Sequence, residues 1–311
     1  MPEVTTPYAT GTPCWVELRS KDQQASLDFY RELFGWQGKP GPAELGGLAV
    51  CELSGKAVAG IVPLTASDAT GWTTCLASTD ADATQKAITA AGGTILIPAV
   101  DVGDRGRALL AADPQGAVFG VWQPGTLSGM QVVHEAGAQT WSELHTSEVS
   151  AAAAFYGKVF GIKAKKVHDT YWELRVDGHY PFASTLPLSL DAPGTPTHWL
   201  TYFAVDDVDS TVAALSKQGG TVLFPPVDGG VRPCGAGRRS AGGALRRDET
   251  AAAAVSHSAK TKAAPRPTEP RSAATGRSVA TAARGPLLTD GPELNCRQGR
   301  ECSCRGRGRG S

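Results

Sequence analysis

Hydrophobic and polar positions along the chain follow two different periods. The segment 14–18, CWVEL, alternates as a half-buried strand does. Residues 21–35 then place apolar side chains three and four apart and end at a glycine, which predicts an amphipathic helix. The stretch 47–64 is apolar on both sides of a Ser-Gly turn and predicts two further strands.

The same order of strand and helix patterns begins again after residue 71. A strand is predicted over 72–79, a helix over 80–93, a strand over 94–98 and a closing hairpin that ends in 111–123. A strand, a helix and then an antiparallel meander indicate βαβββ modules. The predicted fold class is therefore α+β and not a doubly wound parallel sheet.

The whole pattern occurs twice in the chain. Residues 15–36, WVELRSKDQQASLDFYRELFGW, return as 141–162, WSELHTSEVSAAAAFYGKVFGI, and 71–98 return as 198–225. Such an internal repeat predicts two domains, each a pair of βαβββ modules. We place the first domain at 10–126 and the second at 127–228.

The composition changes abruptly at residue 229. Residues 229–311 hold 16 Lys and Arg against 6 Asp and Glu, a net charge of +10, and contain no Phe, Trp, Tyr, Ile or Met. Such a segment buries too little apolar surface to offset its ordering entropy, so we expect a disordered basic tail and a truncated second domain that lacks its last strands. A GC-rich gene read out of frame has this composition, which favours a frameshift near residue 229. A genuine basic arm and an RNA-binding tail are the alternatives.

The remaining 228 residues hold 14 basic and 24 acidic side chains, a net charge of −10. They contain no leader-like segment and no run of about 18 apolar residues, so a cytoplasmic protein without a membrane partner is expected. Cys14, Cys51 and Cys75 stand among apolar residues and are expected to be buried, reduced thiols.

These elements resemble a known family. The strand followed by SLDFYRELFGW, the passage AITAAGGTILIP and the sequence Asp-Pro-Gln-Gly at 113–116 are similar to the vicinal oxygen chelate proteins, also called glyoxalase/bleomycin-resistance/dioxygenase proteins. The resemblance covers about residues 10–228. It implies curved sheets that form a cup around a small ligand, and in many members a divalent metal in that cup.

The resemblance also implies where metal ligands would stand, and the chain departs from it there. The first ligand position falls at Trp15 and Trp141, and the carboxylate of the last strand falls at Gly120. The middle-strand carboxylate falls near Gly60. Indole and glycine offer no ligand atom for a divalent ion. We therefore expect no metal at these positions and no cofactor.

The same positions suggest what fills the cup instead. Because side chains alternate along a strand, the tryptophan and the glutamate two residues later share a face. We expect the ligand-binding residues Trp15, Glu17, Trp72, Trp141, Glu143 and Trp199. Indoles and carboxylates suit a planar aromatic ligand that carries a cation. The alternative is that the indoles are core residues that plug the former metal site and that the glutamates are solvated or paired.

No catalytic constellation is evident, so catalytic residues and enzyme status stay open. His145 is expected to point away from Glu143 to the surface, His179 to lie in a solvated loop, and His198 to be a weak acid/base candidate. Because the first domain has its closing strands, Trp15 is expected to matter more for binding than Trp141.

Tandem chains of this kind also resemble proteins of actinomycete gene clusters for anthracyclines such as daunorubicin and doxorubicin. The resemblance implies a metal-independent binding or accessory protein beside a hydroxylation or late tailoring step, with a tailoring oxygenase as partner. The alternative function is a cofactor-free lyase, isomerase or hydroxylase-like enzyme of the same fold. Nucleic-acid binding by the tail is a third, less favoured, interpretation.

Overall fold

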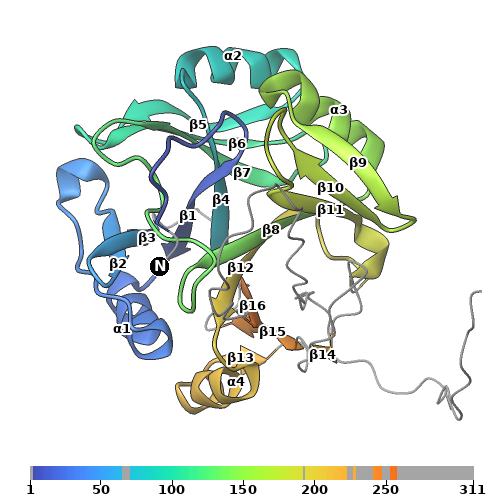
Figure 1. Ribbon diagram of the computed structural model, residues 1–311. Helices are drawn as coiled ribbons and strands as arrows, with labels where there is room; N and C mark the ends of the chain where they lie inside the picture. Colours follow the sequence, from blue (N-terminus) through green and yellow to red (C-terminus); the bar gives the residue numbers. More distant parts are fainter. Residues whose placement is uncertain are drawn as a thin grey trace, which may run out of the picture.

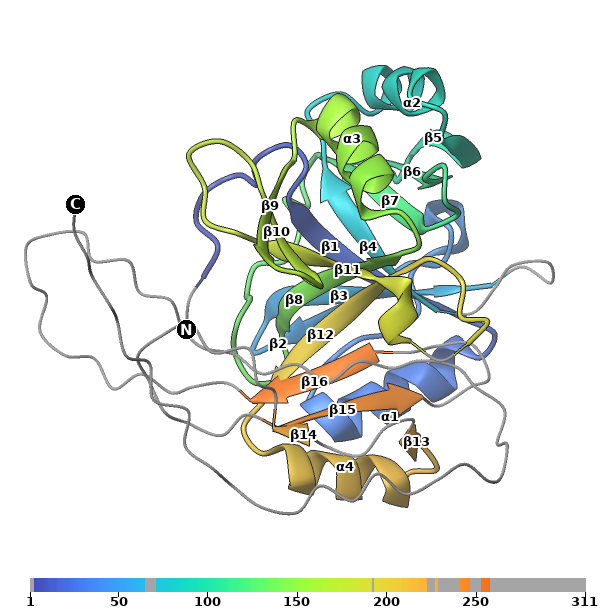
Figure 2. The same ribbon diagram turned by 90° about the vertical axis from the view of Figure 1, so that its right-hand side faces the viewer.

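The computed structural model describes residues 3–64, 71–191 and 193–222, and the backbone of 227–228, 241–246 and 253–257. Two sheets carry the fold, one for each copy of the repeat (Figure 1). Helices of the two copies lie in pairs, with α2 and α3 at one end of the molecule and α1 and α4 at the other (Figures 1 and 2). The fold is α+β with tandem modules, as the sequence predicts.

The first copy begins with β1 (Pro13–Ser20) and α1 (Gln23–Phe34). Asp22 starts α1 by accepting a hydrogen bond from the backbone N–H of Ala25, and Gly35 ends it in a left-handed conformation with φ of 76°. A short 3-10 turn (Ala43–Leu45) precedes β2 (Ala49–Leu53) and β3 (Lys56–Pro63). Between α1 and β2, Gln37 forms one isolated bridge with Glu52.

The second module of the first copy has all its strands. It consists of β4 (Gly71–Ala77), α2 (Ala81–Ala90), β5 (Thr94–Asp101), β6 (Gly106–Ala112) and β7 (Val118–Pro124). The strand order of this sheet is β2-β3-β1-β4-β7-β6-β5. The two modules therefore join edge to edge through the antiparallel pair β1 and β4.

The second copy repeats this plan. It contains β8 (Gln139–Thr146), α3 (Val149–Phe160), β9 (Lys163–His168), β10 (Tyr171–Arg175), β11 (Ala183–Pro187), a 3-10 turn (Leu188–Leu190), β12 (His198–Val205), α4 (Val208–Lys217) and β13 (Thr221–Val222). The antiparallel pair β8 and β12 takes the place of β1 and β4.

The structure differs from the sequence prediction at the end of the second sheet. Three short strands follow β13: β14 (Val227–Asp228), β15 (Ala241–Arg246) and β16 (Ala253–His257). β16 runs parallel to β12 and antiparallel to β15, as β7 does with β4 and β6. Backbone hydrogen bonds suffice for such pairing even in an Ala- and Gly-rich segment. The rest of 229–311 lies outside the described residues, so the disordered tail stays a prediction.

The core joins the two copies. In one cluster Trp72, Trp36 and Phe34 pack around Phe203 of the second copy, and in the other Phe119 packs on Tyr156. Between them the hydroxyls of Thr74 and Thr201, 127 positions apart, lie 3.2 Å from each other. Each sheet therefore buries its helix-bearing face and leaves the opposite face as the candidate site.

Candidate functional site

Strand register divides the six predicted site residues between the two faces of each sheet. In the antiparallel pair β1–β4, Leu18 lies opposite Trp72 and Glu17 opposite Thr73. Directly opposed residues share a face, so Trp72 lies on the helix-bearing face, away from Glu17. Its indole N–H donates a hydrogen bond to the Tyr30 hydroxyl of α1, with a distance of 3.0 Å.

Trp199 occupies the matching place in the second copy. It lies opposite Leu144, and its indole N–H donates to the Tyr156 hydroxyl of α3 at 2.9 Å. The prediction that Trp72 and Trp199 face the cup is therefore wrong. Both indoles are core residues that hold a helix against a sheet, on the face opposite the former metal site, so they neither face the cup nor plug that site.

The opposite faces carry the other four residues. We call the face of β1 with Trp15 and Glu17 the first cup, and the face of β8 with Trp141 and Glu143 the second cup. In the first cup Trp15 is 1% exposed. The side chains of Trp122 and Met130 are buried in the same cluster, so the described residues fill this cup around Trp15.

The family's metal positions in the first cup have no room for a ligand. A Cβ atom at Gly60 would lie 3.0 Å from Nε1 of Trp15 and 2.8 Å from Cδ1 of Leu48. A Cβ atom at Gly120 would lie 2.4 Å from Sγ of Cys75. The residues present therefore do not fit the metal that the family resemblance implies, because Gly60 and Gly120 offer no ligand atom and the side chains of Trp15 and Leu48 occupy its surroundings.

Glu17 has few polar partners. Its carboxylate lies 3.8 Å from the guanidinium of Arg19, and its side chain is 20% exposed. Burial raises the pKa of Glu17, and the neighbouring charge of Arg19 only partly opposes this effect. Cys14, Cys51 and Cys75 are buried free thiols, as predicted, and burial raises the pKa of each.

The second cup is open at its Trp141 end. A cavity of about 330 Å³ lies beside this indole, between the N-terminal segment and the loop 179–182. Its aromatic lining comes from Tyr8, His134, Trp141, His179, Tyr180 and Phe182. Trp141 is held in place by its indole N–H, which donates to the hydroxyl of Ser184 at 3.0 Å. Of the six predicted site residues, Trp141 lines this cavity.

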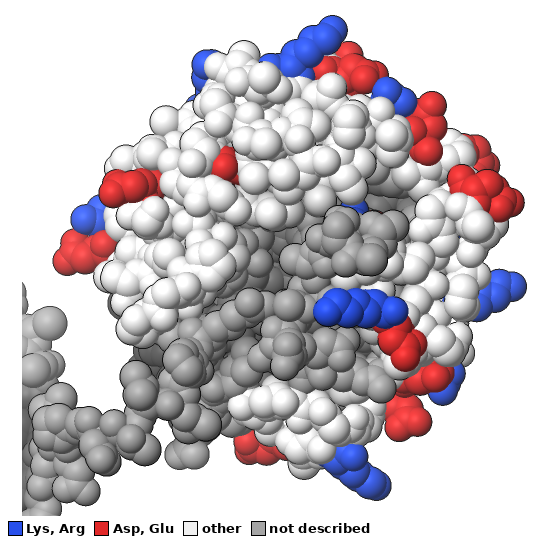
Figure 3. All heavy atoms as spheres, turned by 180° about the vertical axis from the view of Figure 1, so that it is seen from behind, with Lys and Arg blue, Asp and Glu red and all other residues white. Residues whose placement is uncertain are grey.

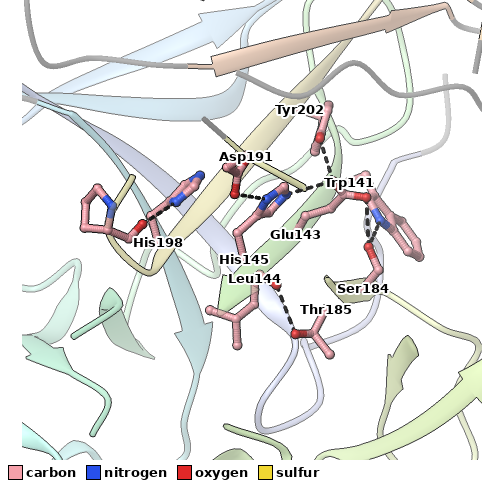
Figure 4. Close-up of polar contacts among 10 residues, drawn as sticks. Trp141, Glu143, Leu144, His145, Ser184, Thr185, Asp191, His198 and Tyr202 are labelled. Carbon is pink, nitrogen blue, oxygen red and sulfur yellow. Dashed lines mark hydrogen bonds and ion pairs between the residues drawn. The ribbon is translucent and has the colours of Figure 1, made fainter. Parts of the chain in front are cut away.

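Glu143 is buried, and both of its carboxylate oxygens have hydrogen-bond partners. One oxygen accepts a hydrogen bond from Ser184 at 3.0 Å, and the other accepts from the hydroxyl of Tyr202 at 2.6 Å (Figure 4). The second oxygen also lies 3.3 Å from Nε2 of His145. Because its lone pairs face other protein groups, Glu143 does not offer a carboxylate to the cavity.

His145 is buried beside Glu143, contrary to the prediction that it points to the surface. Residues two apart on a strand share a face, so alternation itself places His145 on the side of Glu143. Its side chain is 0% exposed, and Nδ1 lies 2.7 Å from Asp191. Burial works to lower its pKa, but the hydrogen bonds to Asp191 and Glu143 outweigh burial and raise the pKa of His145 to about 9.

His198 completes this polar cluster. Its ring stacks on that of His145 with centroids 5.0 Å apart, and Nδ1 donates to the carbonyl oxygen of Pro196 at 2.9 Å. Burial, and then the charge of His145, lower the pKa of His198. The sequence pointed to His198 only weakly and missed Asp191, which follows a 3-10 turn 46 positions after His145.

Comparison with known protein families shows which family this chain belongs to. The model of the glyoxalase/bleomycin resistance protein/dioxygenase superfamily matches residues 13–121 and 138–233. The chain belongs to this superfamily. It is 37% identical to CFP32 of Mycobacterium tuberculosis, whose name includes the word glyoxylase, over 232 residues that cover 71% of this chain and 87% of CFP32. It is 35% identical to the anthracycline biosynthesis protein DnrV of Streptomyces peucetius over 247 residues, 72% of this chain and 87% of DnrV.

Solved structures of superfamily members share the fold. The Mn(II)-bound glyoxalase from Novosphingobium aromaticivorans aligns with a TM-score of 0.56 and 16% identity, over 81% of this chain and 83% of that protein. The 2,3-dioxygenase LapB from Pseudomonas aligns with a TM-score of 0.56 and 14% identity, over 80% and 93%. At such identities the likeness extends to the fold alone.

On the face shown in Figure 3, acidic and basic side chains are interspersed around the rim, and the described residues form no large patch of one sign there. Among the described residues, none of the helices has the length and hydropathy needed to cross a membrane.

Proposed function

We propose that this superfamily member binds a small planar aromatic molecule in the cavity beside Trp141 and serves as an accessory protein in the biosynthesis of an aromatic natural product. The observation that carries the proposal is the position of Trp141. Trp15, Trp72 and Trp199 are 1–8% exposed in the core, whereas Trp141 lines a cavity. A volume of about 330 Å³ lies at the lower end of the range of small-molecule sites.

The lining suits aromatic stacking more than charge pairing. Trp141, Tyr8 and Phe182 offer flat apolar faces to a ring system. Glu143 is 4% exposed and is absent from the lining, so the predicted carboxylate contact to a ligand cation lacks support. The proposed ligand is therefore a neutral planar ring system, or the ring portion of a larger molecule.

The relatives support the biosynthetic setting. DnrV of Streptomyces peucetius and DauV of another Streptomyces strain, 35% and 34% identical to this chain, are named anthracycline biosynthesis proteins. We extend this setting to the present chain and propose a role beside the hydroxylation or late tailoring of a planar polyketide, with an oxygenase as partner. Trp141 stands at the family's first metal-ligand position, and in this proposal its indole contacts the ligand there without a metal ion.

The test is a titration of tryptophan fluorescence with a planar anthracyclinone. The wild-type chain should show saturable quenching. Trp141→Ala should raise Kd by roughly 5- to 150-fold, since loss of one aromatic stacking partner costs about 1–3 kcal/mol. Trp172→Ala is the matched control, because Trp172 is a half-buried strand indole outside the cavity lining and should leave Kd unchanged.

Two results would contradict the proposal. Absence of saturable quenching would show that the cavity does not bind this ligand class. Equal affinities of wild type and Trp141→Ala would place binding elsewhere. Conversion of the titrated ligand into a product would favour the alternative function, a cofactor-free enzyme of this fold.

A further inference from the structure

Three side chains meet at the end of β8 that lies away from Trp141. His145 comes from β8, His198 from the start of β12, and Asp191 follows the 3-10 turn after β11 (Figure 4). One ligand atom of each lies within 4.8 Å of the others. The cluster stands four residues along β8 from Trp141, so it is not the position that the superfamily resemblance gives to a metal ligand.

Both imidazoles are oriented by their outward nitrogen. Nε2 of His145 faces the Glu143 carboxylate at 3.3 Å, and Nδ1 of His198 faces the Pro196 carbonyl at 2.9 Å. A carboxylate and a carbonyl only accept hydrogen bonds, so these nitrogens carry protons. Nε2 of His198 is therefore available to a ligand, whereas Nδ1 of His145 carries a proton that faces Asp191 and becomes available when a metal ion displaces that proton. A metal-binding histidine typically donates its other N–H to a carboxylate or a carbonyl in this way.

The carboxylate of Asp191 supplies an independent observation. Its side chain is 0% exposed, and Oδ2 lies 2.7 Å from Nδ1 of His145. Its other oxygen, Oδ1, is buried without a hydrogen-bond partner among the described residues. A buried carboxylate oxygen that lacks a partner costs free energy, and a cation bound beside it would remove that cost.

We propose that His145, Asp191 and His198 bind one divalent transition-metal ion of the zinc type. Two imidazoles and one carboxylate form a donor set that suits Zn²⁺, and three protein ligands leave a fourth position for water. The ion takes the place of the proton shared between His145 and Asp191.

Neighbouring residues hold the proposed ligands in place through hydrogen bonds. Glu143 orients His145 and is itself held by Tyr202 and Ser184. The first copy cannot form the same site, because Arg19 and Gly71 stand at the positions of His145 and His198. The proposal therefore gives one ion per chain, in the second copy.

The experiment is calorimetric titration of the chelator-treated full chain with Zn²⁺. The wild type should bind one ion that His198→Gln and Asp191→Asn do not bind. Glu143→Gln should weaken binding by about 10- to 100-fold, as loss of an orienting partner does. His168→Gln is the matched control, since His168 is an exposed histidine at the end of β9, outside both proposed sites, and should leave Zn²⁺ binding unchanged.

Substitution with Co²⁺ gives a second readout. His198→Cys keeps a ligand atom at this position and should bind Co²⁺ with a new thiolate absorption band, which a merely structural histidine would not produce. Circular dichroism of each variant checks that it is folded. Equal Zn²⁺ binding by folded wild type and His198→Gln, or no binding by the wild type, would overturn the proposal.

Discussion

The two cups start from the same strand pattern and end with different chemistry. β1 presents Trp15 and Glu17, and β8 presents Trp141 and Glu143. The neighbours on adjacent strands differ: Gly60 and Cys75 flank the first pair, whereas Ser184 and Tyr202 take these places in the second. A further difference is that Arg19 in the first copy stands at the position of His145 in the second.

These neighbours explain the difference in the glutamates. Ser184 and Tyr202 donate hydrogen bonds to Glu143, so both oxygens of this buried carboxyl group have partners. Gly60 has no side chain that could donate to Glu17, and the pKa of Glu17 is raised by burial. Because residue 60 is a glycine, the indole of Trp15 can lie against this strand, where it fills the first cup. The two copies thus share one backbone arrangement, and the different residues on their neighbouring strands leave the first cup filled and the second open.

The largest expected effect tests whether Trp15 is a core residue. Trp15→Ala should lower the free energy of unfolding by about 3–5 kcal/mol, because it leaves a large cavity in a filled cup. Chemical denaturation measures this change. Trp172→Ala, which truncates a half-buried indole, should cost clearly less. A loss below that of Trp172→Ala would show that the first cup is not filled as described.

A smaller effect is expected from the hydroxyl that distinguishes the second cup. Tyr202→Phe removes a 2.6 Å hydrogen bond to the buried Glu143 and should lower the free energy of unfolding by about 1–3 kcal/mol. Thermal denaturation followed by circular dichroism checks this. Tyr180→Phe is the control, because Tyr180 is 78% exposed and its hydroxyl reaches solvent. Equal stability of the two variants would show that the hydrogen bond from Tyr202 to Glu143 does not stabilise the second cup.

The smallest expected effect has the opposite sign. Because the pKa of Glu17 is raised in the folded chain, its ionisation opposes folding, and stability falls as pH rises above the unfolded value of 4.5. Glu17→Gln should therefore raise the free energy of unfolding near neutral pH, by about 1 kcal/mol or less. The gain should shrink as pH falls towards 4.5. Urea denaturation at several pH values measures it, and a destabilised variant at neutral pH would mean that the Arg19 pair outweighs burial.

Local patterns predicted much of this fold from sequence. The repeat, the α+β class and the end of α1 at Gly35 all follow from short-range signals that depend on a few neighbouring residues. The strands β15 and β16 were not predicted, because an Ala- and Gly-rich segment shows no alternation of apolar and polar residues that indicates a strand.

The candidate site was harder to predict because it depends on register. Whether Trp72 shares a face with Glu17 follows from which β4 residue lies opposite it, and that pairing is a long-range property. His145 is different: its period-two spacing from Glu143 was a readable signal that it shares the same face. The contact of His145 with Asp191 carries no such signal, because a helix, three strands and a 3-10 turn separate the two residues along the chain.

The most direct test of the comparison is the number of ligand sites per chain. Calorimetric titration of the full chain with a planar anthracyclinone should give one site, and Trp141→Ala should weaken that site. The filled first cup should add none. Two equivalent sites per chain, or one site that survives in Trp141→Ala, would contradict the assignment of binding to the second cup.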